Sequence, residues 1–380
     1  LVDALRERLP KFELVFSTTT DTGYARAVRL YGAESVFRFP LDFSFVISRV
    51  LRRVKPSMIV LVELEVWHNL VRMATRRGIP VVVINGRLTA HSAKRFRWLG
   101  RAARSMFRDL AWVGAQDETI ASRFRTLGVK QDRIEITSSL KWDSAAVTDQ
   151  IEGAEALGCA LGIDRSRPLW VCGSTGPGEE AVILDAYRRI LGDWPVLARD
   201  VQAKSTQRGD VAGPTLAIVP RKPERFDEVA RVIQRAGFRC VRRSDHDDAN
   251  PIGSCPEPVV LLGDTMGELR KFYSLADVVF VGRTLVPLGG SDPMEVAALG
   301  KPIVAGPYTD NFQLPVGALR AADAIRIVES AGALPSVVGA ILQDRALAEQ
   351  LGSRARQVVI NNQGATNRTA DAVIRVIERI

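Results

Sequence analysis

The residues best suited to chemistry in this chain stand in small-residue turns at the ends of apolar segments. Gly173, Ser174 and Thr175 follow the apolar segment 168–172 and lead into a helical pattern. Such a turn can present backbone N–H groups to an anionic substrate at the start of a helix. Helix capping by the hydroxyl groups explains the same residues. The turn therefore indicates a binding site only together with the other turns described below.

A second turn places cations where a phosphate could bind. The strand-like segment 215–221 ends in Pro220 and Arg221, and Lys222 and Arg225 follow. Because Arg221 stands directly at the strand end, its guanidinium could make a forked contact with a phosphate. Lys222 and Arg225 are interpreted as solvated surface charges. The segment therefore predicts one phosphate ligand, Arg221.

Two further turns, at 263–269 and 288–295, have the composition of a nucleotide site. The first offers backbone groups and a methionine against which a base could lie, although helix capping explains it as well. In the second, paired glycines allow close approach of a ligand, and Glu295 could bind both hydroxyl groups of a ribose. A carboxylate in a first helical turn is also ordinary. The candidates in these turns are Met266, Gly267, Glu268, Asp292, Pro293, Met294 and Glu295.

The first half of the chain offers a pair of carboxylates. Glu63 and Glu65 would share one face of a strand, which is unfavourable unless water, a cation or substrate compensates the charge. Glu65 is the stronger candidate for chemistry. His68 could transfer a proton, but a single histidine is more often a surface or packing residue. With three histidines and four cysteines that form no C-x-x-C pair, the sequence predicts neither a metal site nor a catalytic triad.

The elements that position these turns alternate between strand-like and helical patterns, which predicts parallel sheets with helices on both faces. Two α/β domains are expected, 1–155 and 156–380, facing each other across a cleft beyond their strand ends. The helical tail from about 337 could pack back on the first domain, and 192–214 is interpreted as a surface loop. Because 1–10 reads as a helix without its preceding strand, a strand and a loop are expected upstream of Leu1. The expected strands are 57–64, 81–86, 111–116, 134–139, 168–174, 215–221, 238–243, 258–264, 278–283 and 301–306.

Composition and charge favour a globular protein with an anionic partner. Hydrophobic residues make up 46% of the 380 residues, and the formal net charge is +9. No apolar run is long enough to span a bilayer. Segment 94–110 carries arginines and apolar residues on opposite stripes of one helix, which would suit an anionic membrane surface or, equally, an ordinary packed helix with solvated arginines. No nucleic-acid-binding motif is present, so nucleic acid is not expected as a partner.

Taken in order, these motifs resemble the 3-deoxy-D-manno-octulosonic acid (Kdo) transferases, a family of GT-B glycosyltransferases with two Rossmann-like domains. The match is spread over nearly the whole chain, and the ordered set is specific where each motif alone is weak. The matching segments are 17–20 with 22–23, 63–67, 85–88, 139–143, 173–175 with 178–180, 220–221, 263–268 and 289–295.

The resemblance implies transfer of Kdo from CMP-Kdo to a lipid A precursor, with inversion and without a metal or other cofactor. It implies a protein on the cytoplasmic face of the bacterial inner membrane, held there peripherally or through an upstream anchor. Its acceptor-binding domain would be 1–155 and its CMP-Kdo-binding domain 156–380. Glu65 and Lys141 correspond to positions near the acceptor or the transferred sugar. The implied CMP contacts are Pro220, Arg221, Met266, Gly267, Glu268, Asp292, Pro293, Met294 and Glu295, with Gly173, Ser174 and Thr175 as further substrate contacts.

Three departures from the family pattern bear on the donor. Gly-Gly-His-Asn of the family is Gly289-Gly290-Ser291-Asp292 here, and a carboxylate beside a phosphate repels it. Arg283 stands where the family commonly has glycine and could compensate that charge. The family's general-base glutamate is expected upstream of Leu1. Two alternatives therefore stay open: a GT-B enzyme that uses another nucleotide sugar, and a catalytically silent, membrane-binding relative.

Overall fold

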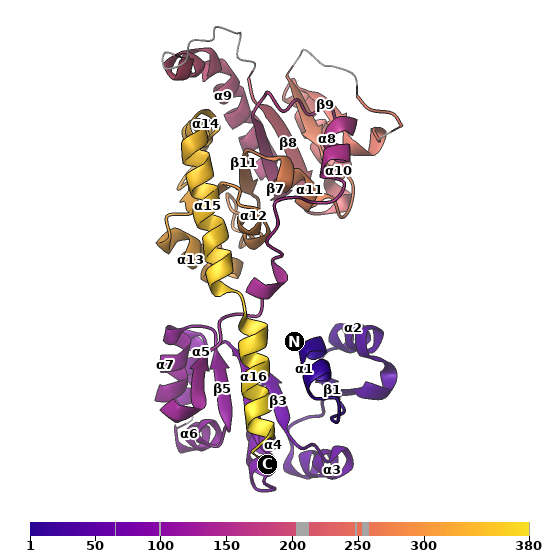
Figure 1. Cartoon of the computed structure of the whole chain (residues 1–380), viewed down its shortest axis with the longest axis vertical. Coiled ribbons are helices and arrows are strands. Elements are labelled where there is room, and N and C mark those ends of the chain that lie inside the picture. Colours follow the sequence, from indigo (N-terminus) through magenta and orange to yellow (C-terminus); the bar gives the residue numbers. More distant parts are fainter. Residues whose placement is uncertain (65, 99, 203–212, 248, 253–257, 380) are drawn as a thin grey trace. The chain divides into compact units, whose positions relative to one another are not determined.

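The chain folds into two compact α/β units. The computed structural model describes residues 1–64, 66–98, 100–202, 213–247, 249–252 and 258–379 (Figure 1). The first unit comprises Leu1–Ser144 and Asn362–Ile380, and the second comprises Ala145–Asn361. The division therefore lies before the boundary placed after residue 155 from the sequence. The end of the helical tail belongs to the first unit rather than to the second.

The first unit is built on a parallel sheet in the order β3-β4-β5-β6 and a separate parallel pair, β1-β2. Continuous runs of β-branched residues such as 81–84 form its strands because both faces of a parallel sheet are covered. The strands are β1 (Phe16–Thr18), β2 (Val36–Arg38), β3 (Ile59–Val62), β4 (Val81–Gly86), β5 (Trp112–Ala115) and β6 (Ile134–Ile136). The helices are α1 (Val2–Arg8), α2 (Asp21–Tyr31), α3 (Ser44–Val54), α4 (His68–Thr75), α5 (Ala90–Trp98), α6 (Gly100–Arg108), α7 (Glu118–Thr126) and α16 (Ala365–Ile377).

The last helix, α16, completes the first unit. It lies along the sheet in Figure 1, and its Ala370 and Val373 pack in one core with Val82 and Trp112. Asp143 caps this helix: its carboxylate accepts the N–H groups of Gly364 at 2.7 Å and Thr366 at 2.5 Å. Partial burial acts to raise the pKa of Asp143, but these hydrogen bonds outweigh it and hold the pKa below its usual value.

The second unit contains a seven-stranded parallel sheet in the order β13-β12-β11-β7-β8-β10-β9. Its core is packed from buried side chains such as Trp170, Tyr187 and Phe280. The strands are β7 (Leu169–Thr175), β8 (Thr215–Pro220), β9 (Arg239–Arg242), β10 (Val259–Leu262), β11 (Val278–Val281), β12 (Ile303–Ala305) and β13 (Ile325–Ile327). The helices are α8 (Ala154–Ala160), α9 (Glu179–Gln202), α10 (Phe226–Arg235), α11 (Leu269–Leu275), α12 (Met294–Ala298), α13 (Gln313–Ala321), α14 (Leu334–Gln343) and α15 (Arg345–Asn362).

Two expectations from the sequence are wrong. The interval 192–214 is not a loop in its first part, because α9 continues to Gln202 with Trp194 buried in the core; residues 203–212 lie outside the described part of the chain. Segment 94–110 is not one helix. It forms α5 and α6, and Gly100, with φ +58°, has the left-handed backbone conformation that glycine adopts without strain.

Candidate functional site

Most of the proposed site residues lie at the carboxyl end of the sheet in the second unit. They are the last residues of β7 and β8 and residues of the segments that follow β8, β10 and β11, including the start of α12. The loops after β7 and β11 approach each other very closely. A Cβ atom on Gly282 would lie 2.6 Å from the Ser174 carbonyl oxygen, so only glycine fits there. Ser174 and Arg283 both have positive φ, +56° and +63°. A glycine at position 283 would adopt this conformation more easily than arginine does.

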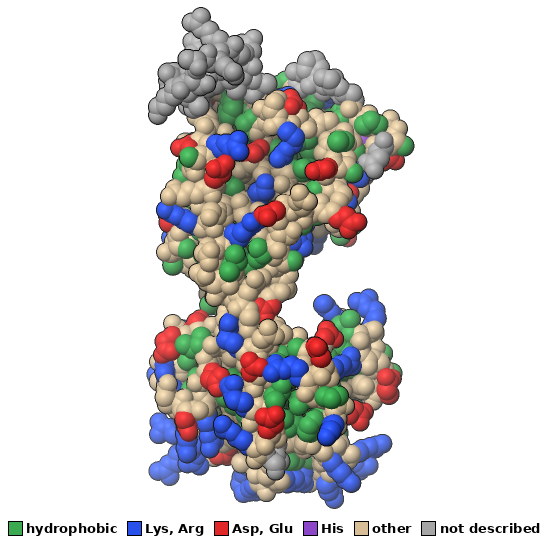
Figure 2. All heavy atoms as spheres, viewed as in Figure 1, with side chains coloured by type: hydrophobic (Ala, Val, Ile, Leu, Met, Phe, Trp, Pro, Cys, Tyr) green, Lys and Arg blue, Asp and Glu red, His purple; other side chains and the backbone are tan. Residues whose placement is uncertain are grey.

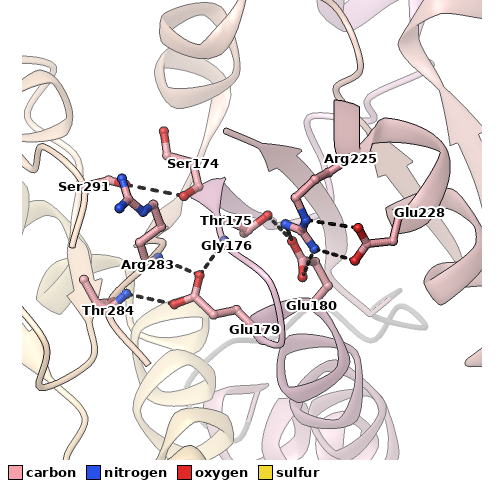
Figure 3. A network of polar contacts seen from close by, with 10 residues as sticks. All are labelled: Ser174, Thr175, Gly176, Glu179, Glu180, Arg225, Glu228, Arg283, Thr284 and Ser291. Atoms are coloured by element: carbon pink, nitrogen blue, oxygen red, sulfur yellow. Dashed lines mark hydrogen bonds and ion pairs between the residues drawn. The ribbon is translucent and has the colours of Figure 1, made fainter. Parts of the chain in front are cut away.

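The carboxylate of Glu179 ties these two loops together (Figure 3). One of its oxygens accepts the N–H groups of Gly176 at 2.8 Å and Arg283 at 2.6 Å, and the other accepts those of Thr284 at 2.8 Å and Leu285 at 2.9 Å. Burial raises the pKa of Glu179, while the four donors act in the opposite direction. The carboxylate is therefore a structural tie, because its lone pairs are used by the backbone.

A buried ion pair lies beside this tie. Arg225 makes a forked contact with Glu180, at 2.7 and 3.0 Å, and reaches Glu228 at 3.0 Å (Figure 3). The hydroxyl of Thr175 donates to Glu180 at 2.8 Å. Arg225 is only 8% exposed, so its interpretation as a solvated surface charge is wrong. A guanidinium can be buried here because two carboxylates share its donors.

Arg221 and the turn 173–175 lie next to each other. The N–H of Arg221 donates to the Thr175 carbonyl at 3.2 Å, and Pro220 pairs with Thr175 in the register of β7 and β8. The Arg221 side chain is exposed, and no ion pair in the described residues includes it. In the turn itself, Gly173 packs against the ring of Tyr273, and Thr175 is buried. Ser174 is the partly exposed residue of the three.

The turn after β10 presents its backbone and Met266. The Met266 side chain is 70% exposed, and Gly267 has a φ of +86°. The Glu268 carboxylate is bound instead by Arg243, at 2.9 and 3.2 Å, and by Lys271 at 3.2 Å. Partial burial acts to raise the pKa of Glu268, but Thr265 and these two cations lower it overall. A nucleotide would thus meet Met266 and backbone groups here.

The turn after β11 holds a partly buried carboxylate pair. Asp292 accepts the Met294 N–H at 2.9 Å and caps α12. The side chains of Pro293 and Met294 are buried. Burial raises the pKa of Glu295, and the charge of Asp292 raises it further, while Arg270 opposes both. Within the described chain, no side chain or backbone group donates a hydrogen bond to Glu295, which leaves its oxygens able to accept two hydroxyl groups.

The candidates in the first unit are less well defined. Glu65 lies outside the described residues. Lys141 is exposed, and its N–H donates to the Ser139 hydroxyl at 3.4 Å.

A buried amide pair near Lys141 was missed from the sequence. The Asn85 side-chain oxygen accepts from Gln116 at 2.9 Å and from the Leu140 N–H at 3.2 Å. These bonds join the end of β4 to the segment that carries Lys141. The signal available in the sequence was an asparagine at the end of an apolar strand, because asparagine tolerates the left-handed conformation that Asn85 has here, with φ +50°.

The described residues also bear on metals and membranes. They contain no group of three or more His, Cys, Asp or Glu side chains placed to hold a metal ion. In the same part of the chain, none of the helices has the length and apolar character needed to cross a bilayer.

Comparisons with known proteins identify the family. Residues 1–144 match the family model for 3-deoxy-D-manno-octulosonic-acid transferase (kdotransferase). The chain is 33% identical to the 3-deoxy-D-manno-octulosonic acid transferase of Haemophilus influenzae over 382 residues, which covers 100% of this chain and 84% of that protein. It is 34% identical to the transferase of Bordetella pertussis over 382 residues, covering 98% and 82% of the two chains.

The fold is that of a known glycosyltransferase architecture. The crystal structure of MurG from Acinetobacter baumannii matches with a TM-score of 0.54 at 14% identity, covering 100% of this chain and 95% of that one. This likeness concerns the fold, with its two Rossmann-like domains. Together with the full-length sequence matches, it shows that the chain belongs to the Kdo transferase family of GT-B glycosyltransferases.

Proposed function

We propose that this protein transfers Kdo from CMP-Kdo to a lipid A precursor in lipopolysaccharide biosynthesis. The observation that carries the proposal is the set of side chains left available at the carboxyl end of one sheet. Arg221 is an exposed cation beside the turn after β7, Met266 is an exposed apolar side chain, and Glu295 is a carboxylate without a donor in the described chain. These match the three parts of a nucleoside monophosphate: phosphate, base and ribose.

The donor would be activated by positive groups placed beside its phosphate. An acceptor hydroxyl oxygen would bond to the anomeric carbon of Kdo and give its proton to a general base. The bond from that carbon to the phosphate oxygen breaks, and its electron pair stays on the CMP phosphate. Arg221 would stabilise this charge, with N–H groups of the turn after β7. Glu295 would hold the ribose hydroxyl groups and so fix the nucleotide against Met266. The proposal needs no cofactor, since these groups supply the stabilisation that the leaving phosphate requires.

One feature favours testing other donors. Asp292 lies close enough to Glu295 to raise its pKa, so two carboxylates border the place proposed for the nucleotide. Such a pair weakens binding of a phosphate unless a cation compensates it. The side chain of Arg283 is held at 2.9 Å from the Leu288 carbonyl, on the same loop. Titrating the protein with CMP, UDP and GDP would show which base it prefers.

We further propose that the acceptor binds the first unit and that the protein works on the cytoplasmic face of the inner membrane. The exposed arginines of α5 and α6, including Arg97, Arg101 and Arg104, would face anionic headgroups. Trp98 is 87% exposed, which suits a side chain that enters the interface between water and lipid. Lys141, exposed at the end of the segment after β6, would contact the acceptor or the transferred sugar.

Release of CMP tests the proposed reaction. The protein is mixed with CMP-Kdo and a lipid A precursor, and free CMP and the glycosylated lipid are measured together. Both should appear in equal amounts, and both should depend on the lipid. CMP release without product would indicate hydrolysis. If CMP binds but neither product forms, the protein is a silent relative, and the assignment as a transferase is wrong.

A further inference from the structure

A groove between two helices of the first unit carries an unusual concentration of positive charge. It lies between α4 and α6, which pack against each other, and has a volume of about 550 Å³. Figure 2 shows Lys and Arg side chains gathered over the end of this unit where α3, α4 and α6 lie. The groove is lined by His68, Arg72 and Thr75 from α4, by Arg76, which directly follows α4, by Arg101 and Ser105 from α6, and by Asp109, which follows α6.

The spacing of these residues directs their side chains to one place. His68, Arg72 and Arg76 recur every four residues, so they share one face of α4. Arg101 and Ser105 have the same spacing on α6. Two helical faces thus meet across the groove with guanidinium groups on both sides. Hydroxyl groups of Thr75 and Ser105 add neutral donors between them.

The arginines of the groove have no side-chain partners among the described residues. No ion pair or side-chain hydrogen bond in the described residues includes Arg72, Arg76 or Arg101. Asp109 is the acid in the lining, and Arg108, outside the groove, lies 3.9 Å from it. Like charges that share a groove repel one another unless an anion neutralises them. The arrangement of forked donors on two walls suits a phosphate group with two negative charges.

Exposed apolar side chains belong to segments that adjoin the helices of the groove. Trp98 is the last residue of α5 and comes three residues before Arg101 in the sequence; its side chain is 87% exposed. At the start of α4, the Asp42 carboxylate accepts the N–H groups of Asn69 and Leu70, directly after His68. The residues flanking Asp42 are strongly exposed: Leu41 by 73%, Phe43 by 55% and Phe45 by 74%, with the two phenyl rings stacked 6.0 Å apart.

We propose that this groove binds the phosphate monoester of a lipid headgroup at the membrane surface. A site for a soluble anion needs the cations alone, whereas the exposed aromatic and aliphatic side chains of the adjoining segments require an apolar phase beside the phosphate. The lipid would place its phosphate between α4 and α6 while the side chains at 41–45 and Trp98 enter the interface. The inference rests on the proposed function only in that both require a membrane lipid.

Binding to vesicles tests the groove. The full chain is mixed with vesicles of phosphatidylcholine alone, or containing phosphatidic acid, which has a phosphate monoester, or phosphatidylglycerol, which has a diester. Arg101→Gln and Arg72→Gln should weaken binding to phosphatidic acid by about tenfold or more, because each removes charge-assisted hydrogen bonds. Arg104→Gln is the matched control. It removes the same charge from α6 outside the groove lining and should cost at most about fivefold. Arg101→Lys should restore only part of the loss.

Three results would overturn the proposal. Equal losses for Arg101→Gln and Arg104→Gln would show diffuse attraction to negative charge instead of a site. Equal binding to phosphatidic acid and phosphatidylglycerol would show that the groove does not select a phosphate monoester. If inorganic phosphate binds the protein as tightly as the vesicles do, the ligand is a soluble anion. CMP binding by the wild-type protein is measured beside these arms. If the proposed donor function is wrong, the CMP measurement will show it. If the proposed lipid site is wrong, only the vesicle measurements will show it.

Discussion

Replacing Glu179 with glutamine tests whether a single carboxylate holds together the loops after β7 and β11. In the structure each oxygen of Glu179 accepts two backbone N–H groups, from the loops after β7 and β11. A glutamine amide offers one oxygen and one NH2 group, so one pair of N–H donors would face another donor. The pair from Gly176 and Arg283 or the pair from Thr284 and Leu285 loses its acceptor.

The size of the effect follows from these contacts. A hydrogen bond to a charged acceptor contributes about 1.5–3 kcal/mol, so the loss of two is worth about 3 kcal/mol at the lower end of that range. The lower end applies because glutamine also removes the cost of burying a charge, which is visible in the raised pKa of Glu179. A change of about 3 kcal/mol corresponds to roughly a hundredfold change in a local opening equilibrium.

Hydrogen–deuterium exchange measures this directly. In the Glu179→Gln variant, one of the two N–H pairs should exchange about a hundredfold faster than in the wild type. Glu224→Gln is the control: Glu224 is exposed and has no partner in the described chain, so protection at 283–285 should not change. If all four amide groups keep wild-type protection in Glu179→Gln, the loops are held by other contacts and the reasoning is wrong.

The remaining predictions concern the donor site and the last helix. Arg221→Gln should lower the affinity for CMP about tenfold or more in calorimetric titration without lowering the melting temperature, since the side chain has no ion-pair partner among the described residues. The pKa of Glu295 lies above its ordinary 4.5, so Glu295 becomes protonated at a higher pH than a normal glutamate, and the affinity for CMP should fall at that pH. Asp292→Asn removes one cause of the raised pKa, so the fall in affinity should move to lower pH and the affinity at neutral pH should rise. Asp143→Ala should reduce the free energy of unfolding of the first unit by about 1 kcal/mol in urea titration, because α16 loses its cap. The depressed pKa of Asp143 means that this stabilisation is present above the ordinary value of 3.8 and is lost as pH falls through the lowered one.

The strands were predictable because their sequence signal is local. Segments 81–86 and 215–221 are continuous runs of mainly apolar, β-branched residues, and they form β4 and β8 within one residue of the expected bounds. Parallel pairing followed from the alternation with helices, and the structure confirms it. The positions of the site turns followed in the same way, since ligands bind beyond the carboxyl ends of such strands.

The predictions that were wrong concern residues whose environment depends on contacts between distant parts of the chain. Arg225 looks like a surface cation until Glu180 is brought beside it by the packing of α9. Segment 94–110 has the periodicity of one helix, but Gly100 has a positive φ and the segment forms two helices, α5 and α6. A sequence does not show which of its charges will meet.

The packing of α16 against the sheet of the first unit has a consequence for synthesis of the protein. Residues 1–144 lack part of their own core until Ala370 and Val373 arrive. During translation, the core of the first unit can therefore be completed only after the whole second unit has been synthesised. The second unit can fold before the first unit is complete. Until then the part of the apolar surface around Val82 and Trp112 that α16 covers stays exposed to water, and a chaperone would be needed most in this interval.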